Sequence, residues 1–178
     1  MKMRGVMAAA AAAIFFVGAV DAHGPTRQRA DSSVEINASV EKVWAAVGDF
    51  GNMDWHPRVS ETQIEGAGTD EAVRTLVLES GDAIVQEIRR YDEERMTYAY
   101  RATEFDVDVL PVSNYTGTIT VTENGDGTST VEWRAAFTRA EQQNDPPEHL
   151  NEEAAHAAIN ALYEEGLSGL KELVEGGS

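Results

Sequence analysis

The sequence contains no cysteine among its 178 residues. Disulfide bonds, thiol chemistry and cysteine metal sites are therefore excluded, and the chain must be held together by packing. Positive charge is also scarce, because 14 Lys and Arg residues stand against 31 Asp and Glu residues. A surface this acidic repels nucleic acid and anionic membranes, so neither is expected as a partner. It is compatible with solvation alone, with a salt-rich habitat or with a basic protein partner.

Long apolar runs are confined to the N-terminus. Lys2 and Arg4 precede an Ala-rich apolar run over residues 6–20, and residues 20–22 offer a cleavage site. The run of about 15 residues is shorter than the roughly 20 that cross a bilayer, which favours a cleaved secretory signal over 1–22 rather than a membrane anchor. We therefore expect a periplasmic or secreted chain of 178 − 22 = 156 residues, with 12 basic and 30 acidic side chains, a net charge near −18 and no membrane association after signal removal.

Most of the remaining sequence has the pattern of β-strands. A leader over 23–31 is expected to be flexible. Beyond it, alternation of apolar and polar residues predicts strands over 34–37, 59–65, 72–78, 83–91, 97–103, 113–123 and 130–139. Short turns join them, and Asn124-Gly125 is typical of a hairpin because both residues accept positive φ at low cost. The pattern predicts one antiparallel, hairpin-connected sheet.

Helical segments follow the first strand and the last. Ser39 can cap a helix of about two turns, and residues 49–57 (DFGNMDWHP) are expected to form a second short one. A long helix is predicted from Glu148 to residue 176, because apolar residues recur there three and four apart. Asp145 is its expected N-cap.

The order of these elements resembles the helix-grip fold of the START/SRPBCC superfamily, which includes polyketide cyclase/dehydrase-like proteins. The resemblance rests on residues 36–44 (INASVEKVW), 49–57, 91–92 (YD) and 163–167 (YEEGL), and covers nearly all of the chain after residue 22. It implies an α+β fold in a single domain over 32–176. A seven-stranded antiparallel sheet would wrap around a long C-terminal helix, with two short helices after strand 1.

A narrower resemblance concerns the signal and three further stretches. Residues 23–27 (HGPTR), 55–57 (WHP) and 110–115 (LPVSNY) are similar to the MxaD-type periplasmic proteins of methanol-oxidation gene clusters. This resemblance implies an accessory protein that assists a quinoprotein alcohol dehydrogenase and its cytochrome c. The partner would then be one of these two proteins.

The helix-grip resemblance also implies a cavity between sheet and helix for an apolar or amphipathic small molecule. The alternative is that the same residues simply fill a closed core. The candidate lining residues are Leu76, Leu78, Tyr98, Tyr100, Tyr115, Ile119, Trp133, Phe137, Ile159 and Tyr163.

Two charged residues could form a buried polar pair. Arg74 shares a strand face with Leu76 and Leu78, and Glu87 lies in the next strand. If both pointed inward they would have to pair, because a buried charge is tolerated only when it is paired and hydrogen-bonded. The face of Glu87 is ambiguous, and a pair on the outer surface is the alternative.

The resemblance places Trp55, His56 and Arg58 at the cavity mouth. His56 could act as a hydrogen-bonding group, a proton acceptor or a lone metal ligand, and Trp55 as a lid or an exposed partner anchor. The alternative is a packed corner in which Trp55 fills space and His56 caps a turn.

No metal and no cofactor is predicted. Glu104, Asp106 and Asp108 could suit calcium, but they lack the turn of an EF-hand and are better explained as charges that protect an edge strand. His23, as a new N-terminus, could chelate copper only with further ligands.

The sequence also lacks the nucleophile, zinc-protease and phosphate-loop motifs of common enzymes. The leading hypothesis is therefore a periplasmic accessory protein without catalysis. The alternatives are a carrier or sensor of an apolar small molecule and, less favoured, a cyclase- or dehydratase-like enzyme that uses His56 or Glu87 as acid or base.

Overall fold

The computed structural model describes residues 24–177, so the predicted signal over 1–22 and His23 lie outside the described residues. Residues 24–177 form seven strands, two α-helices and one 3-10 turn. In chain order these are β1 (Gln28–Ile36), α1 (Val40–Val47), β2 (Val59–Glu65), β3 (Val73–Leu78), β4 (Ala83–Asp92), β5 (Thr97–Glu104), β6 (Val112–Glu123), β7 (Ser129–Arg139), η1 (Glu148–Leu150) and α2 (Glu152–Gly176).

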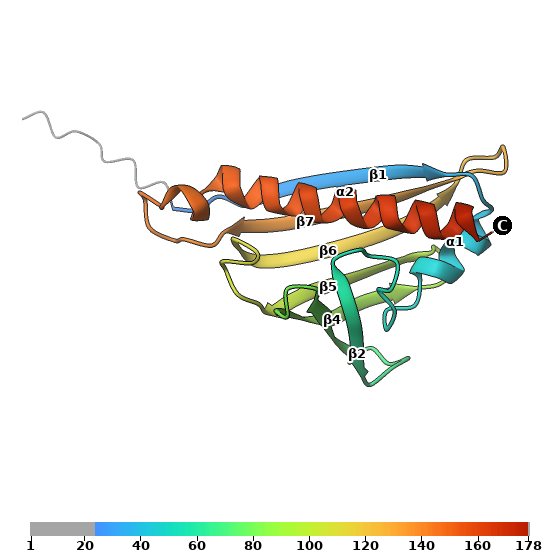
Figure 1. The fold of residues 1–178 in the computed structure, drawn as a ribbon, viewed down its shortest axis with the longest axis horizontal. Helices are drawn as coiled ribbons and strands as arrows, with labels where there is room; N and C mark the ends of the chain where they lie inside the picture. The colour runs from blue at the N-terminus through green and yellow to red at the C-terminus, as the bar shows by residue number, and fades with distance from the viewer. Residues whose placement is uncertain (1–23, 178) are drawn as a thin grey trace, which may run out of the picture.

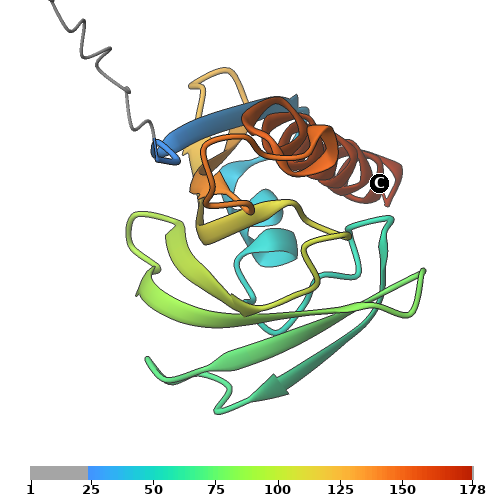
Figure 2. The same ribbon diagram turned by 90° about the vertical axis from the view of Figure 1, so that its left-hand side faces the viewer.

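All seven strands join in one antiparallel sheet with the order β1-β7-β6-β5-β4-β3-β2. The end-on view in Figure 2 shows that this sheet is strongly curved. The long helix α2 lies along the β1 and β7 side of the sheet, and α1 packs beside its C-terminal half (Figure 1). The predicted helix-grip architecture is confirmed.

The first strand begins earlier than predicted. Gln28 already pairs with Phe137 of β7, so residues 28–31 belong to the sheet rather than to a flexible leader over 23–31. The start of β1 was missed because its exposed and half-buried residues are polar or charged, and Ala30 is buried alone among them. Backbone pairing at a sheet edge needs no apolar alternation, so the domain starts before residue 32.

The second predicted short helix is wrong: residues 50–58 form a series of turns. Asp49 Oδ1 accepts a hydrogen bond from the Gly51 N–H at 2.8 Å, and Asn52 Oδ1 accepts one from the Asp54 N–H at 2.8 Å. Asp and Asn side chains that bond the backbone two residues on favour turns over helix. Only α1 is helical here, with Ser39 as the predicted N-cap.

The start of α2 also differs from the prediction. Asn151 is its N-cap, and its Oδ1 accepts a hydrogen bond from the Ala154 N–H at 2.8 Å. Asp145 lies outside the helix, in the segment between β7 and η1.

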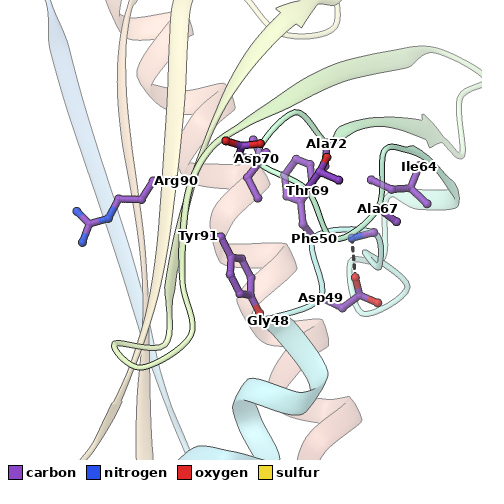
Figure 3. A pocket seen from close by; sticks show the side chains of 13 residues that line it. Gly48, Asp49, Phe50, Ile64, Ala67, Thr69, Asp70, Ala72, Arg90 and Tyr91 are labelled. Atoms are coloured by element: carbon purple, nitrogen blue, oxygen red, sulfur yellow. Dashed lines mark hydrogen bonds between the residues drawn. The ribbon is translucent and has the colours of Figure 1, made fainter.

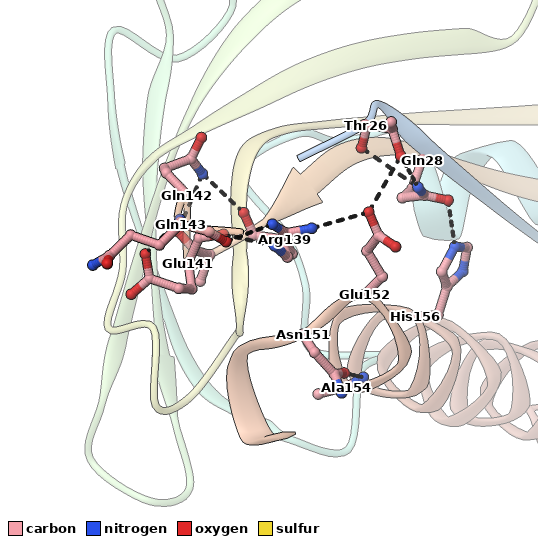
Figure 4. Close-up of polar contacts among 11 residues, drawn as sticks. Thr26, Gln28, Arg139, Glu141, Gln142, Gln143, Asn151, Glu152, Ala154 and His156 are labelled. Carbon is pink, nitrogen blue, oxygen red and sulfur yellow. Dashed lines mark hydrogen bonds and ion pairs between the residues drawn. The ribbon is translucent and has the colours of Figure 1, made fainter. Parts of the chain in front are cut away.

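Arg139, at the end of β7, anchors this segment (Figure 4). Its guanidinium donates to the Glu141 carbonyl at 2.8 Å and to the Gln143 carbonyl at 2.7 Å. It also pairs with the Glu152 carboxylate at 3.2 Å. A buried arginine thus ties the connecting segment to the first turn of α2 through three acceptors.

The core lies between the concave sheet face and one face of α2. That helix buries Ala155, Ile159, Leu162, Tyr163, Gly166, Leu167, Leu170 and Val174. No helix among the described residues is long and apolar enough to cross a membrane.

Candidate functional site

The residues predicted to line a central cavity do meet between sheet and helix, but they fill the space there. None of the ten is more than 7% exposed. A cavity of about 10 Å³ remains beside Leu76, Leu78 and Trp133. That volume holds roughly one water molecule. In this structure these residues therefore form a closed core.

Three tyrosines and a tryptophan form a hydrogen-bonded chain through that core. Trp133 Nε1 donates to the Tyr100 hydroxyl at 3.0 Å. The Tyr100 and Tyr115 hydroxyls are 3.0 Å apart, and those of Tyr115 and Tyr163 are 2.9 Å apart. The Tyr163 hydroxyl donates to the backbone carbonyl of Arg134 at 3.4 Å. Each phenol can thus accept from one neighbour and donate to the next.

Burial keeps the three tyrosine hydroxyls of this hydrogen-bonded chain protonated. It raises the pKa of Tyr100, and raises those of Tyr115 and Tyr163 well above their ordinary value. All three phenols therefore stay neutral at physiological pH. The chain ends at a backbone carbonyl rather than at a base, so it serves to satisfy buried polar groups.

Trp55 and His56 are packed in the interior of the protein and do not lie at the mouth of a cavity. Trp55 and His56 are 3% and 1% exposed. The Trp55 and Trp133 ring centroids lie 5.5 Å apart, and His56 meets Trp133 at 6.1 Å. Neither side chain reaches the surface, so the prediction of a lid or exposed partner anchor is wrong and the packed-corner alternative holds.

Both ring nitrogens of His56 bond the backbone. Nε2 lies 3.0 Å from the Leu162 carbonyl of α2, and Nδ1 accepts from the Arg58 N–H at 3.1 Å. This pattern requires the neutral ring with its proton on Nε2. Burial lowers the pKa of His56 to about 4, against the weaker upward effect of the Leu162 bond. His56 is therefore a neutral link between the corner and α2, with no free nitrogen for proton transfer or a metal.

Arg58 makes a second, outer link between the same elements. Its guanidinium forms a two-pronged pair with the Glu165 carboxylate, at 2.5 Å from each nitrogen. The pair is exposed, so its contribution to stability is small, about 0–1 kcal/mol.

The predicted buried pair of Arg74 with Glu87 is also wrong. In the register of β3 and β4, Arg74 stands opposite Gln86, and Glu87 stands opposite Val73. Gln86 points inward, where its Oε1 accepts from Arg74 Nε at 2.8 Å. Glu87 points outward and lies 3.6 Å from Arg89. The surface alternative does not hold for Arg74 either, because its side chain is fully buried.

An open pocket lies at a place that the sequence did not indicate. We call it the Phe50 pocket, and its volume is about 350 Å³. Three segments form it: the end of α1 with its following turn, the β2–β3 connection, and the last half of β4 (Figure 3). Its lining residues are Gly48, Asp49, Phe50, Gly51, Ile64, Ala67, Gly68, Thr69, Asp70, Ala72, Ile88, Arg90 and Tyr91.

The chemistry of the Phe50 pocket suits binding of an apolar group. Phe50, Ile64, Ala72 and Ile88 supply apolar walls. Tyr91 stands at its edge, 46% exposed, with its ring 5.8 Å from that of Trp44. Arg90 points away from the other lining side chains (Figure 3). Among residues 24–177, no group of three or more acidic or His side chains is arranged to hold a metal ion.

Comparison with known proteins agrees with this fold. The sequence matches the family model for polyketide cyclase/dehydrase and lipid transport over residues 27–175. No curated protein matches it significantly. An uncharacterised protein from Bacillus thuringiensis is 28% identical with a TM-score of 0.70, over 83% of this chain and 98% of that one. The protein XoxI from Bacillus cereus is 28% identical with a TM-score of 0.69, over 82% of this chain and 94% of that one.

An enzyme also shares the architecture. The Zhui aromatase/cyclase from Streptomyces sp. R1128 has a TM-score of 0.63 over 85% of this chain and 93% of its own, but only 17% identity. This likeness concerns the fold alone. Because the family model spans nearly the whole described chain, the protein belongs to the polyketide cyclase/dehydrase and lipid transport family of the START/SRPBCC superfamily, a family of ligand-binding and cyclase-like proteins.

Proposed function

We propose that this protein binds an amphipathic small molecule in the Phe50 pocket and works as a carrier or sensor. The observation that carries the proposal is an open pocket of ligand size with apolar walls, in contrast to the nearly closed core. The Phe50 pocket measures about 350 Å³, whereas the space beside Leu76 and Trp133 measures about 10 Å³. Pockets for small ligands typically begin at about 300 Å³.

The walls and the rim of the pocket support an amphipathic ligand. Phe50, Ile64 and Ile88 offer apolar surface, which favours burial of a hydrocarbon or ring by roughly 25 cal/mol per Å². Asp49, Thr69 and Asp70 place polar groups around the apolar walls. A ligand with one apolar body and one polar end would match both parts.

We favour a protein that binds the small molecule without converting it. His56 has both nitrogens committed to the backbone, and Glu87 faces away from the interior. The two residues considered for acid/base chemistry therefore do not face a common substrate position.

A blocking substitution at the pocket rim tests the proposal. Ala67 is exposed and lines the pocket, whereas Ala157 is exposed on α2 away from it. Octanol, titrated calorimetrically, should bind the parent protein and the control Ala157→Trp equally. Ala67→Trp should weaken binding by about tenfold or more, because a loss of roughly 1.4 kcal/mol of contact suffices. Equal affinity in all three proteins would place the ligand elsewhere and overturn the proposal.

We also propose, as a second candidate, the periplasmic accessory role with a quinoprotein alcohol dehydrogenase or cytochrome c. What favours it is charge: a chain of 12 basic and 30 acidic residues after signal removal attracts a basic partner at long range. The contact surface would lie outside Trp55 and His56, because both are buried.

Gene deletion tests this second candidate. Loss of the protein should slow electron transfer from dehydrogenase to cytochrome, and added salt should weaken the association of the purified proteins. Unchanged alcohol-dependent respiration in the deletion strain would reject the partnership.

A further inference from the structure

Arg74 is a buried cation without a counter-charge. Its side chain is fully buried, and only two of its nitrogens have acceptors. Nε donates to Gln86 Oε1 at 2.8 Å, and Nη1 donates to the Phe50 carbonyl at 3.0 Å. Nη2 has no hydrogen-bond acceptor among residues 24–177, and no carboxylate there pairs with the guanidinium. Both of its acceptors are neutral, so the positive charge is not neutralised.

A second buried arginine, Arg139, has the negatively charged partner that Arg74 lacks. Arg139 is 6% exposed and reaches the Glu152 carboxylate at 3.2 Å, in addition to two backbone carbonyls. A buried charge normally needs such a partner, since leaving it unpaired is strongly destabilising. Contacts with the faces of Phe50 and Tyr100, at 4.3 and 5.1 Å, offset only part of that cost for Arg74.

A second unused polar group lies beside Arg74. The Tyr98 hydroxyl is fully buried and has no hydrogen-bond partner among the described residues. The Arg74 guanidinium lies 5.9 Å from the Tyr98 ring centroid. Burial raises the pKa of Tyr98 and the nearby charge of Arg74 acts against that rise, so this phenol is a neutral donor that faces a cation. The two groups are close enough to interact with each other, but the Tyr98 hydroxyl proton and the Arg74 Nη2 protons have no acceptor in hydrogen-bond geometry among residues 24–177.

Phe50 separates these donors from the open pocket. Its ring lies over the guanidinium at 4.3 Å, and the same residue lines the Phe50 pocket. Phe50 lies in the turn between Gly48 and Gly51. Phe50 thus belongs both to the wall of the pocket and to the immediate surroundings of Arg74.

We propose that Arg74 and Tyr98 form the head-group site for a carboxylate, so that the ligand of the Phe50 pocket is a small amphipathic monocarboxylate. This inference rests on the proposed function of the pocket. It directs the polar end of the ligand inward, away from the rim carboxylates of Asp49 and Asp70, which would repel a second carboxylate. One carboxylate oxygen accepts from Arg74 Nη2 and the other from the Tyr98 hydroxyl, while the Phe50 ring turns aside. The apolar tail lies against Ile64, Ala72 and Ile88. A carboxylate supplies both the missing charge and two acceptors.

Octanoate and octanol test the proposal, because they share a tail and differ in the head group. The parent protein should bind octanoate about tenfold or more tightly than octanol. Arg74→Met should abolish that preference by weakening octanoate and leaving octanol within about twofold. The matched control is Arg89→Met, which removes the same charge from the outer face of β4 and should change neither affinity.

Tyr98→Phe provides a second test that does not depend on how well the arginine variant folds. It removes only the free hydroxyl and should reduce the preference for octanoate by about threefold to tenfold. Equal binding of octanoate and octanol to the parent protein would overturn the carboxylate site and leave the pocket proposal standing. Parallel loss of both ligands in Arg74→Met would likewise overturn it, since Arg74 would then only support the shape of the pocket. Failure of both ligands to bind the parent protein would reject the pocket and the carboxylate site together.

Discussion

Two buried tyrosines on neighbouring strands, Tyr98 of β5 and Tyr115 of β6, have opposite roles. The Tyr98 hydroxyl has no partner among the described residues, whereas Tyr115, across the sheet on β6, holds together the hydrogen-bonded chain through Tyr100 and Tyr163. Tyr98→Phe should therefore leave the free energy of unfolding unchanged or raise it by about 1 kcal/mol, because an unsatisfied group is removed.

Tyr115→Phe is the matched comparison. It breaks two hydrogen bonds between buried hydroxyls and should lower the free energy of unfolding by about 1–3 kcal/mol. Urea denaturation of both variants measures the difference. Equal losses in the two would show that the Tyr98 hydroxyl is bonded in solution and would remove one of the two free donors.

His56 makes stability depend on pH in a defined direction. Its pKa is lowered from 6.5 to about 4 in the folded protein, so between these values the unfolded chain binds more protons. Stability is thus fully present above the unfolded pKa and falls as the pH drops from 6.5 towards 4. Between about pH 7.5 and pH 5, this single group should remove roughly 2 kcal/mol.

His56→Gln isolates that contribution. Carboxylates such as Glu165 titrate in both proteins, so the informative quantity is the difference in pH slope between the parent protein and the variant. The variant should lose much less stability over this range, as measured by urea unfolding at the two pH values. An identical slope would mean that His56 is not buried neutral in the folded state.

At the scale of elements, small residues let α2 approach the corner closely. A Cβ at Gly166 would lie 2.6 Å from His56 Cδ2 and 2.8 Å from Trp133 Cζ3. Gly166→Ala should lower the free energy of unfolding by about 1–3 kcal/mol, although Ala favours a helix more than Gly does.

Gly176→Ala is the control on the same helix, because a Cβ there meets nothing within 4 Å. It should be neutral or stabilising by up to about 1 kcal/mol. Thermal or urea unfolding distinguishes the two. A stabilising Gly166→Ala would show that α2 and the corner are not in contact as described.

The elements themselves were largely predictable from the sequence. Alternation placed six of the strands within one residue of their observed ends, because each has one buried and one solvated face. The start of β1 was not predicted, because Gln28 and Arg29 are polar residues in an edge strand and show no alternation of apolar and polar side chains. The turns at 50–58 were not predicted, because they depend on hydrogen bonds from the backbone to the Asp49 and Asn52 side chains. The spacing of apolar residues carries no information about such bonds.

The site was far less predictable than the elements. The Phe50 pocket joins segments around residues 48–51, 64–72 and 88–91, and their meeting depends on the curvature of the sheet and on turn geometry. The inward face of β4 is ambiguous in the sequence because Ile84, Val85 and Ile88 are all apolar, so the alternation does not distinguish Gln86, which points inward, from Glu87, which points outward. The sequence offers one indication of this pocket. Phe50 is an aromatic residue within the stretch 49–57 and lies between Gly48 and Gly51.

At the scale of the whole molecule, the proposed ligand lies beside α1, the β2–β3 connection and β4 rather than between the centre of the sheet and α2. A chemical-shift map of backbone amides during titration with octanoate tests this claim most directly. We predict shifts concentrated at Phe50, Ala72 and Ile88, with little change at Ile159 and Tyr163. Shifts concentrated at Trp133, Ile159 and Tyr163 would show that the core opens to take the ligand, and would rule out the Phe50 pocket as its site.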